Sequence, residues 1–271
     1  MNIKTPDQIA ETTVNIGIQK VALSSAGSSL YRLMTLSIAA GAFIALGGIL
    51  STVIGSGFPE ATAGNPSLQK LLSGMVFPVG LVLVVVLGAE LFTGNNALLI
   101  PALKRSHYTL TDVLRNWTLV WIGNFIGALI VAVALVYLAG LTTPEPYHTA
   151  IIRTAETKAN LPWTTVLLRG IGANWCVCLA VWLALSGHTL TEKVVGCWIP
   201  VAAFVMLGYE HCVANMFFIP CGMLEGADVD IVQLLWCNLA PATLGNIAGG
   251  ALFVGMLHGY IRLSGNNEKD R

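Results

Sequence analysis

Charged residues are scarce in this sequence of 271 residues, where Asp, Glu, Lys and Arg make up 10% and hydrophobic residues 55%. An ordinary soluble domain carries roughly 25% charged residues, so this composition excludes one. The 14 basic and 14 acidic side chains cancel, so no global charge attracts nucleic acid. The apolar runs also lack the alternation of a membrane strand, which favours membrane helices over a barrel.

Motifs of other classes are missing as well. The six cysteines form no Cys-x-x-Cys pair, so neither a disulfide framework nor a redox motif is predicted, and no cofactor is expected. The N-terminus has no basic-then-apolar signal peptide. Residues 5–18 instead predict a helix with Thr5 as N-cap and Pro6 at its first position. We expect that helix to lie at the membrane interface or against another subunit.

Six apolar runs are long enough to cross about 30 Å of hydrocarbon, which takes roughly 20 helical residues. They lie near residues 30–55, 72–103, 114–140, 163–187, 194–223 and 231–262. The second and fifth are too long for one straight crossing, which indicates broken helices. We predict a single membrane domain over residues 1–271, divided into a cytoplasmic amphipathic helix within 1–28, six spans within 29–263 and a tail at 264–271.

Basic residues predict which way the chain faces. An even number of spans places both termini on one side of the membrane. That side carries Lys4, Lys20, Arg32, Lys104, Arg105, Arg115, Lys193, Arg262, Lys269 and Arg271. The other side carries Lys70, Arg153, Lys158 and Arg169. Because cytoplasmic loops hold the excess of Lys and Arg, we expect a multi-pass protein of the inner membrane with both termini in the cytoplasm.

Glu210 and His211 are the only Asp, Glu, His, Lys or Arg residues between positions 194 and 224. Ionisable groups at bilayer depth are costly, so they usually face a cavity and mark a substrate or ion pathway. The alternative is a Glu–His pair that only ties helices together. The pattern favours the pathway.

The stretch around Glu90 is similar to the stretch around Glu210. Glu90 is the only charged residue between positions 72 and 103, and a glycine stands two positions before it, as before Glu210. Asn124 follows Glu90 by 34 positions, and Asn246 follows Glu210 by 36. Interrupted helices at corresponding places in two halves predict a substrate site where the halves meet.

Two polar residues lie outside these stretches. Residues 141–162 are expected to form an outer loop, in which Lys158 is either simply solvated or concentrates anions at a pore mouth. Asn174 lies inside the fourth span and needs a partner, for which the broken backbone of a neighbouring span is a candidate.

Three segments resemble motifs of one known family, the formate/nitrite transporters. Residues 86–94 (Val-Leu-Gly-Ala-Glu-Leu-Phe-Thr-Gly) and 170–180 (Gly-Ile-Gly-Ala-Asn-Trp-Cys-Val-Cys-Leu-Ala) resemble its signature segments. Residues 209–216 (Tyr-Glu-His-Cys-Val-Ala-Asn-Met) are similar to its fifth-helix break. The resemblance implies an all-α, aquaporin-like fold of two inverted three-helix halves. It also implies a homopentamer in membrane lipid with one pore per protomer, and a transporter rather than an enzyme.

The resemblance also implies roles for individual residues. His211 corresponds to the central pore histidine and Thr93 to its hydroxyl partner, while Leu91 and Phe92 belong to the same interrupted segment and gate the cytoplasmic side if they swing. The polar residues implied to line or brace the route are Lys158, Asn174, Asn246, Asn215, Glu90 and Glu210. The residues at the apolar constrictions are Phe77, Leu81, Val177 and Phe204.

Formate is the substrate that the resemblance favours. Residues 180–187 and 215–220 look closest to the formate branch, whereas Trp175 and Tyr209 lean toward the nitrite branch. Nitrite and hydrosulfide remain alternative substrates. An ionised carboxylate is costly to desolvate, so we hypothesise that Lys158 attracts the anion and His211 supplies a proton. The substrate then crosses as the neutral acid or as an anion paired with imidazolium. Backbone N–H groups freed at the two breaks are further candidates for binding the anion.

Two alternatives come from other classes. The first is a channel for water or glycerol, against which the chain has no pair of Asn-Pro-Ala motifs and only Asn96-Ala97 approaches one. The second is a membrane enzyme or metal site built on Glu210, His211 and Cys212. Three residues adjacent on a helix point in different directions and do not converge on one ion, so we expect no metal site.

Overall fold

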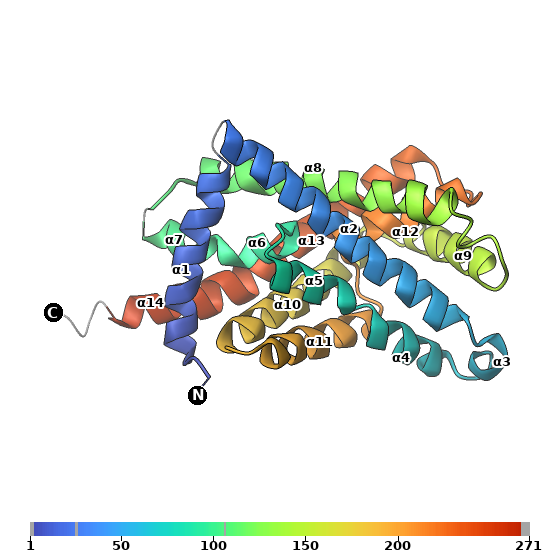
Figure 1. Cartoon of the computed structure of the whole chain (residues 1–271), viewed down its shortest axis with the longest axis horizontal. Helices are drawn as coiled ribbons and strands as arrows, with labels where there is room; N and C mark the ends of the chain where they lie inside the picture. The colour runs from blue at the N-terminus through green and yellow to red at the C-terminus, as the bar shows by residue number, and fades with distance from the viewer. Residues whose placement is uncertain (1–2, 25–26, 106, 267–271) are drawn as a thin grey trace.

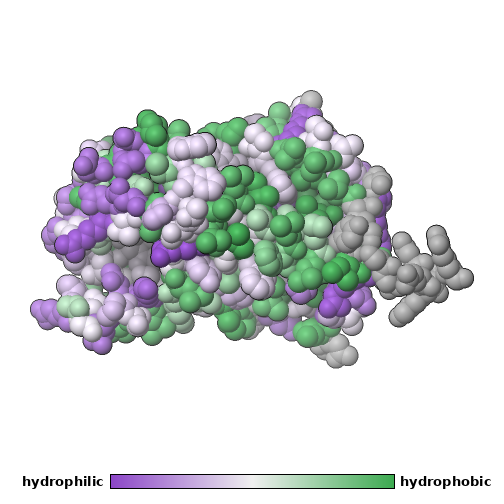
Figure 2. All heavy atoms as spheres, turned by 180° about the vertical axis from the view of Figure 1, so that it is seen from behind, coloured by the Kyte–Doolittle hydropathy of each residue, from purple (hydrophilic) through white to green (hydrophobic). Residues whose placement is uncertain are grey.

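The structure is a computed structural model that describes residues 3–24, 27–105 and 107–266. It confirms the six predicted spans. The segments long and apolar enough to cross a membrane are Ser28–Ser56, Pro66–Leu87, Leu110–Tyr137, Trp163–Ser186, Leu190–Leu207 and Gln233–Leu263. Figure 2 shows apolar side chains across the middle of the molecule, with polar ones gathered most densely at one end and in smaller groups toward the other. The protein is therefore an all-helical, multi-pass membrane protein.

The first half of the chain contains a leading helix, three spans and one break. α1 (Pro6–Leu23) crosses the end of the molecule where the C-terminal helix α14 (Ile261–Asn266) also lies (Figure 1). The following elements are α2 (Ser28–Ser56), α3 (Pro59–Thr62), α4 (Pro66–Val76), α5 (Val79–Leu87), α6 (Phe92–Leu98), α7 (Ile100–Lys104), α8 (Leu110–Ile130) and the π-helical continuation η1 (Val131–Tyr137).

The second half repeats this plan. Its elements are α9 (Tyr147–Ala159), α10 (Trp163–Ser186), α11 (Leu190–Leu207), α12 (Cys212–Leu224), η2 (Gln233–Leu239), α13 (Ala240–Gly250) and η3 (Ala251–Tyr260). The expectation of a plain loop over residues 141–162 is wrong, because α9 lies within it. Ile151, Ala155 and Ala159 recur every four residues and are buried, so this segment has the apolar spacing of an amphipathic helix. The prolines that flank it led to the expectation of a loop.

The predicted breaks in the second and fifth spans are present at equivalent glycines. α5 ends at Gly88 with φ 69°, and α11 ends at Gly208 with φ 71°. A left-handed residue reverses the chain at a helix end, and glycine adopts that conformation without a Cβ penalty. Each span therefore stops midway and restarts as a short helix, α6 or α12, whose residues are largely buried.

Glycines also let the helices of each half approach closely. A Cβ on Gly127 of α8 would collide with the carbonyl of Ile38 in α2, and one on Gly249 of α13 would collide with the carbonyl of Ile171 in α10. Small residues serve this purpose in membranes because lipid provides no hydrophobic drive for helix association. The α2–α8 and α10–α13 pairs are thus built alike in the two halves.

α1 starts as predicted but packs against its own chain. Thr5 accepts the Gln8 N–H and closes a capping box. The buried face of α1 is formed by Ile9, Ala10, Thr13, Val14 and Gly17. Ion pairs tie the helix to the end of α7 (Arg105–Glu11) and to α14 (Arg262–Asp7). α14 continues to Asn266, beyond the boundary predicted at 263. Lys269 and Arg271 of the predicted tail lie outside the described residues.

Candidate functional site

A small chamber of about 10 Å³ lies where the two halves meet. This is close to the smallest volume that holds one water molecule. Its wall consists of Ile44, Phe77, Leu81, Leu91, Val177, Val201, Phe204 and His211. One imidazole therefore faces seven apolar side chains.

A wide cavity of about 870 Å³ opens beside this chamber. Phe77, Phe204 and His211 line both spaces, so these three side chains form the partition between them. The two phenyl rings meet edge to face with centroids 5.7 Å apart, and Phe204 stacks on the imidazole at 5.8 Å. The partition is a packed aromatic constriction with a single polar ring in it.

His211 is held by hydrogen bonds at both ring nitrogens. It is the N-cap residue of α12, and its Nδ1 accepts the Ala214 N–H at 3.1 Å. A backbone N–H only donates, so the proton of the neutral ring is on Nε2. That nitrogen lies 3.0 Å from Oγ1 of Thr93, which accepts it. The His211–Thr93 contact therefore joins the two broken spans, as α12 and α6 supply one partner each.

Both buried glutamates are ion-paired. Nζ of Lys158 lies 3.0 and 3.1 Å from the two carboxylate oxygens of Glu210. Nζ of Lys20 lies 2.8 Å from Oε1 of Glu90. The predicted burial of both acids is confirmed, with 4% of Glu90 and 2% of Glu210 exposed. A buried carboxylate requires such a partner because desolvating an unpaired charge is very costly.

Asparagines extend each pair into a network. Asn95 Nδ2 donates to Glu90 at 2.9 Å and to Asn116 at 3.0 Å. In the other half, Asn215 Nδ2 donates to Glu210 and to Asn238, both at 2.7 Å.

Each network closes on the backbone of its lysine. Asn116 Nδ2 donates to the carbonyl of Lys20 at 3.1 Å, and Asn238 Nδ2 donates to that of Lys158 at 2.9 Å. α1 in the first half is therefore the counterpart of α9 in the second. Sequence reasoning missed Lys20, Asn116 and Asn238, although Asn116 follows Asn95 by 21 positions and Asn238 follows Asn215 by a similar 23.

Two further asparagines cap the broken spans. Asn124 Oδ1 accepts the Phe92 N–H at 2.9 Å, and Asn246 Oδ1 accepts the Cys212 N–H at 2.8 Å. The N–H of Ala214 is bonded to His211. The expectation that N–H groups at the breaks bind an anion is therefore wrong for these three donors, because side chains of the protein already occupy them.

Asn174 finds the partner that the sequence required. Its Nδ2 lies within 3.1 Å of the Thr93 carbonyl, 3.0 Å of Asn96 Oδ1 and 2.6 Å of the Asn246 carbonyl. It therefore braces the two broken halves against each other behind the His211–Thr93 contact. It does not belong to the chamber wall.

Five of the six residues predicted for the constrictions or the gate lie together at the chamber, namely Phe77, Leu81, Leu91, Val177 and Phe204. Phe92 does not. Its ring packs edge to face on Trp117 with centroids 6.4 Å apart. The wall also contains Ile44 and Val201, which the sequence did not single out because they look like any other apolar residue of a span.

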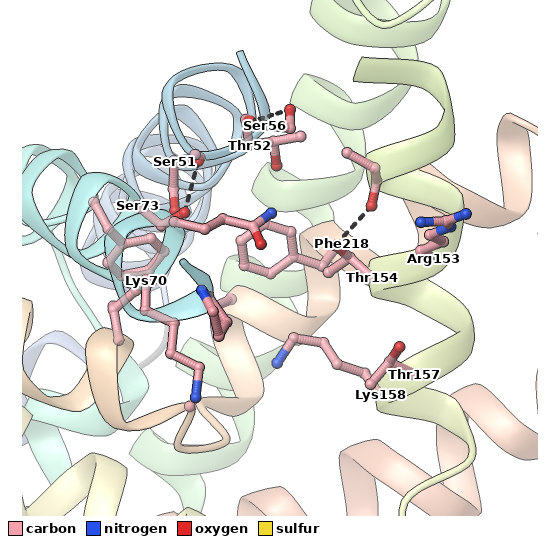
Figure 3. A pocket seen from close by; sticks show the side chains of 18 of the residues that line it. Ser51, Thr52, Ser56, Lys70, Ser73, Arg153, Thr154, Thr157, Lys158 and Phe218 are labelled. Carbon is pink, nitrogen blue, oxygen red and sulfur yellow. Dashed lines mark hydrogen bonds between the residues drawn. The ribbon is translucent and has the colours of Figure 1, made fainter. Parts of the chain in front are cut away.

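The wide cavity is rich in basic residues. Four of them line it, namely Lys70, Arg153, Lys158 and Arg169, together with the acids Glu145 and Glu210. Figure 3 shows Lys158 from α9 and Lys70 from α4 reaching into the same space near the ring of Phe218. Lys158 is neutralised by Glu210. Within residues 3–24, 27–105 and 107–266, Lys70, Arg153 and Arg169 have no carboxylate oxygen within 4.0 Å.

Metal-binding groups do not gather at this site. In the described part of the chain, no cluster of three or more His, Cys, Asp or Glu side chains could hold a metal ion. The metal-site alternative therefore has no ligand set among those residues.

The fold and site together define a multi-pass membrane protein with an interrupted, internally repeated core. The chain belongs to the formate/nitrite transporter family, whose model matches residues 7–260. It is 42% identical over 249 residues to a probable formate transporter of Methanothermobacter thermautotrophicus, covering 86% of this chain and 90% of that protein. It is 40% identical over 262 residues to a formate channel of Bacillus thuringiensis, covering 95% of each. A solved structure described as a pentameric formate channel with formate bound superposes with a TM-score of 0.76 at 32% identity, covering 88% of this chain and all of that one.

Proposed function

We propose that this protein conducts formate across the membrane, with movement of a proton coupled to that of the anion. The observation that carries the proposal is the chamber itself. A single imidazole, hydrogen-bonded to a hydroxyl group, faces an otherwise apolar wall beside a cavity whose cations Lys70, Arg153 and Arg169 are not ion-paired within the described residues. The names of the two relatives and of the solved channel support formate as the substrate.

The geometry supports a passage in which the substrate is neutral inside the chamber. The cations Lys70, Arg153 and Arg169 raise the local concentration of the anion in the wide cavity. The anion then meets the partition of Phe77 and Phe204, where no water accompanies it. Because desolvating an ionised carboxylate is very costly, the protonated acid is the form that crosses.

His211 is the residue that passes the proton on. Its Nδ1 accepts the Ala214 N–H, so a second proton can enter the ring only when this bond breaks. The relay therefore requires the imidazole or the first turn of α12 to move. Thr93 holds Nε2 and, through it, the orientation of the ring.

The remaining site residues have supporting roles. Leu81, Leu91, Val177, Phe77 and Phe204 exclude water and ions from the chamber. The residues that hold the broken spans in place are Glu90, Glu210, Lys158, Asn174, Asn215 and Asn246. Phe92 supports α6 by packing on Trp117 rather than by gating.

The protein works as a homopentamer in the inner membrane, with both termini in the cytoplasm and the wide cavity facing outward. The pentameric formate channel to which the chain is similar supports the assembly. The excess of Lys and Arg on the side of the termini supports the orientation. α1 and α14 then lie at the cytoplasmic end.

Uptake into liposomes tests the proposal. Purified protein is reconstituted, and formate, nitrite and hydrosulfide uptake are compared at about pH 5 and about pH 7.5, which bracket the usual pKa of histidine. Formate uptake should rise with acidity and carry protons inward. His211→Ala should abolish this pH dependence, and Thr93→Val, which keeps the shape but removes the hydroxyl partner, should weaken it.

The matched control is His258→Ala, because His258 lies in η3 outside the chamber wall. It should transport like the wild type. Unchanged pH dependence in His211→Ala refutes the relay. A preference for nitrite or hydrosulfide at both pH values refutes formate as the substrate while keeping the chamber as the pathway.

A further inference from the structure

The two halves can be aligned residue by residue through their hydrogen bonds. The Glu90 N–H donates to the carbonyl of Leu36, and the Glu210 N–H donates to that of Arg169. In the broken spans, corresponding residues thus differ by 120 positions (Glu90 and Glu210). In α2 and α10 they differ by 133 (Leu36 and Arg169). Asn124 and Asn246 obey the same alignment, because they bond the carbonyls of Ser37 and Gly170, which again differ by 133.

This alignment sorts six of the eight chamber residues into three pairs. Ile44 of α2 corresponds to Val177 of α10 by the shift of 133. Leu81 corresponds to Val201, and Leu91 corresponds to His211, by the shift of 120. All six line the chamber. Its wall is thus built twice, once by each half, and the two residues missing from the predicted constriction, Ile44 and Val201, complete the pairs.

The pairs differ in how freely their members can move. Ile44, Val177 and Val201 are β-branched residues in helices, where such side chains have one strongly preferred χ1 rotamer. They cannot swing aside as a leucine or phenylalanine can. Ile44 is 2% and Val201 1% exposed, so neighbouring atoms also hold them in place.

We propose that Ile44 and Val201 are specificity-determining residues that set the greatest width of the solute passing the chamber. This inference rests on the proposed function and deepens it. The chamber holds about one water molecule, which is less than the three heavy atoms of formate, so the wall must yield as the solute enters. The aromatic partition and the leucines yield, whereas Ile44 and Val201 fix the limit together with Val177, the β-branched residue already predicted at the constriction.

Acetate is the probe for this limit, since it exceeds formate by one methyl group. One methylene in a tight apolar pocket changes selectivity by roughly 10- to 200-fold. Ile44→Ala, Val201→Ala and the double variant are reconstituted in liposomes, and acetate and formate uptake are measured together. The ratio of acetate to formate uptake should rise by roughly 10-fold or more in the double variant. Ile44→Val, which removes one methyl group, should give a smaller rise with the fold intact.

Ile49→Ala is the matched control, because Ile49 is buried in the same helix but does not line the chamber. It should leave the ratio unchanged. The inference is overturned if the double variant keeps the wild-type ratio, or if Ile49→Ala raises the ratio equally. Wild-type protein that carries no formate refutes only the proposed function. In that case the width limit is tested with nitrite and the larger nitrate. If the ratio of nitrate to nitrite uptake in the double variant equals that of the wild type, the inference is overturned as well.

Discussion

Removing one partner of the Lys158–Glu210 ion pair should lower the stability of the protein by an amount that can be worked out from the burial of the pair. Glu210→Gln leaves the ammonium group without its charged partner, while the amide still offers one oxygen to Asn215. The side chain of Lys158 is 17% exposed and that of Glu210 3%. The pair is therefore largely withdrawn from water, and the uncompensated lysine charge dominates the energetic cost.

The magnitude follows from this burial. Removing one partner of a buried ion pair costs about 3–5 kcal/mol. Because Lys158 lines the wide cavity and retains some contact with water, we expect the lower end, about 3 kcal/mol. For a chain of this size, that corresponds to a fall in melting temperature of roughly 6–12 °C. Lys158→Met should cost a similar amount, since it strands the carboxylate.

Thermal unfolding of the purified protein in detergent measures these changes. The double variant Glu210→Gln/Lys158→Met should be more stable than the sum of the two single effects predicts, by at least about 1 kcal/mol. Lys70→Met removes from the same cavity a cation that has no ion-pair partner in the described part of the chain, and it should change stability by no more than about 0.5 kcal/mol. Additive single effects, or an equal loss in Lys70→Met, would refute the assignment of a buried, stabilising pair.

Two further predictions concern the cavity and the capping asparagines. Lys70→Ala should weaken apparent formate affinity at low salt, and the difference should vanish near 1 M salt, where the Debye length is about 3 Å; a difference that persists there would contradict steering. Asn246→Ala should lower stability by at least about 3 kcal/mol, because the Cys212 N–H and the carbonyls of Gly170 and Glu210 lose their partner at about 1–3 kcal/mol each. Asn124→Ala should do the same in the first half, and a variant of either residue as stable as the wild type in thermal unfolding would refute the capping role.

The sequence by itself determined the parts of this protein that the membrane constrains strongly. Spans of about 20 apolar residues are dictated by hydrocarbon thickness, and all six were predicted. The length of the second and fifth runs predicted the breaks, and the structure places them at Gly88 and Gly208, the glycines that stand two positions before the buried glutamates. Glu90 and Glu210 were recognisable because a charge at that depth is rare.

Contacts between segments far apart in the chain were decided only by the tertiary structure. Lys20 looked like one more basic residue of the cytoplasmic side, and only the docking of α1 brings its ammonium group to Glu90. Lys158 looked free to attract anions, and only the packing of α9 on α12 pairs it with Glu210. Ile44 and Val201 are indistinguishable in sequence from lipid-facing residues. Apolar side chains carry no signal of which face they occupy in a helix that is hydrophobic on all sides, so the limiting wall of the chamber appears only when the two halves are folded together.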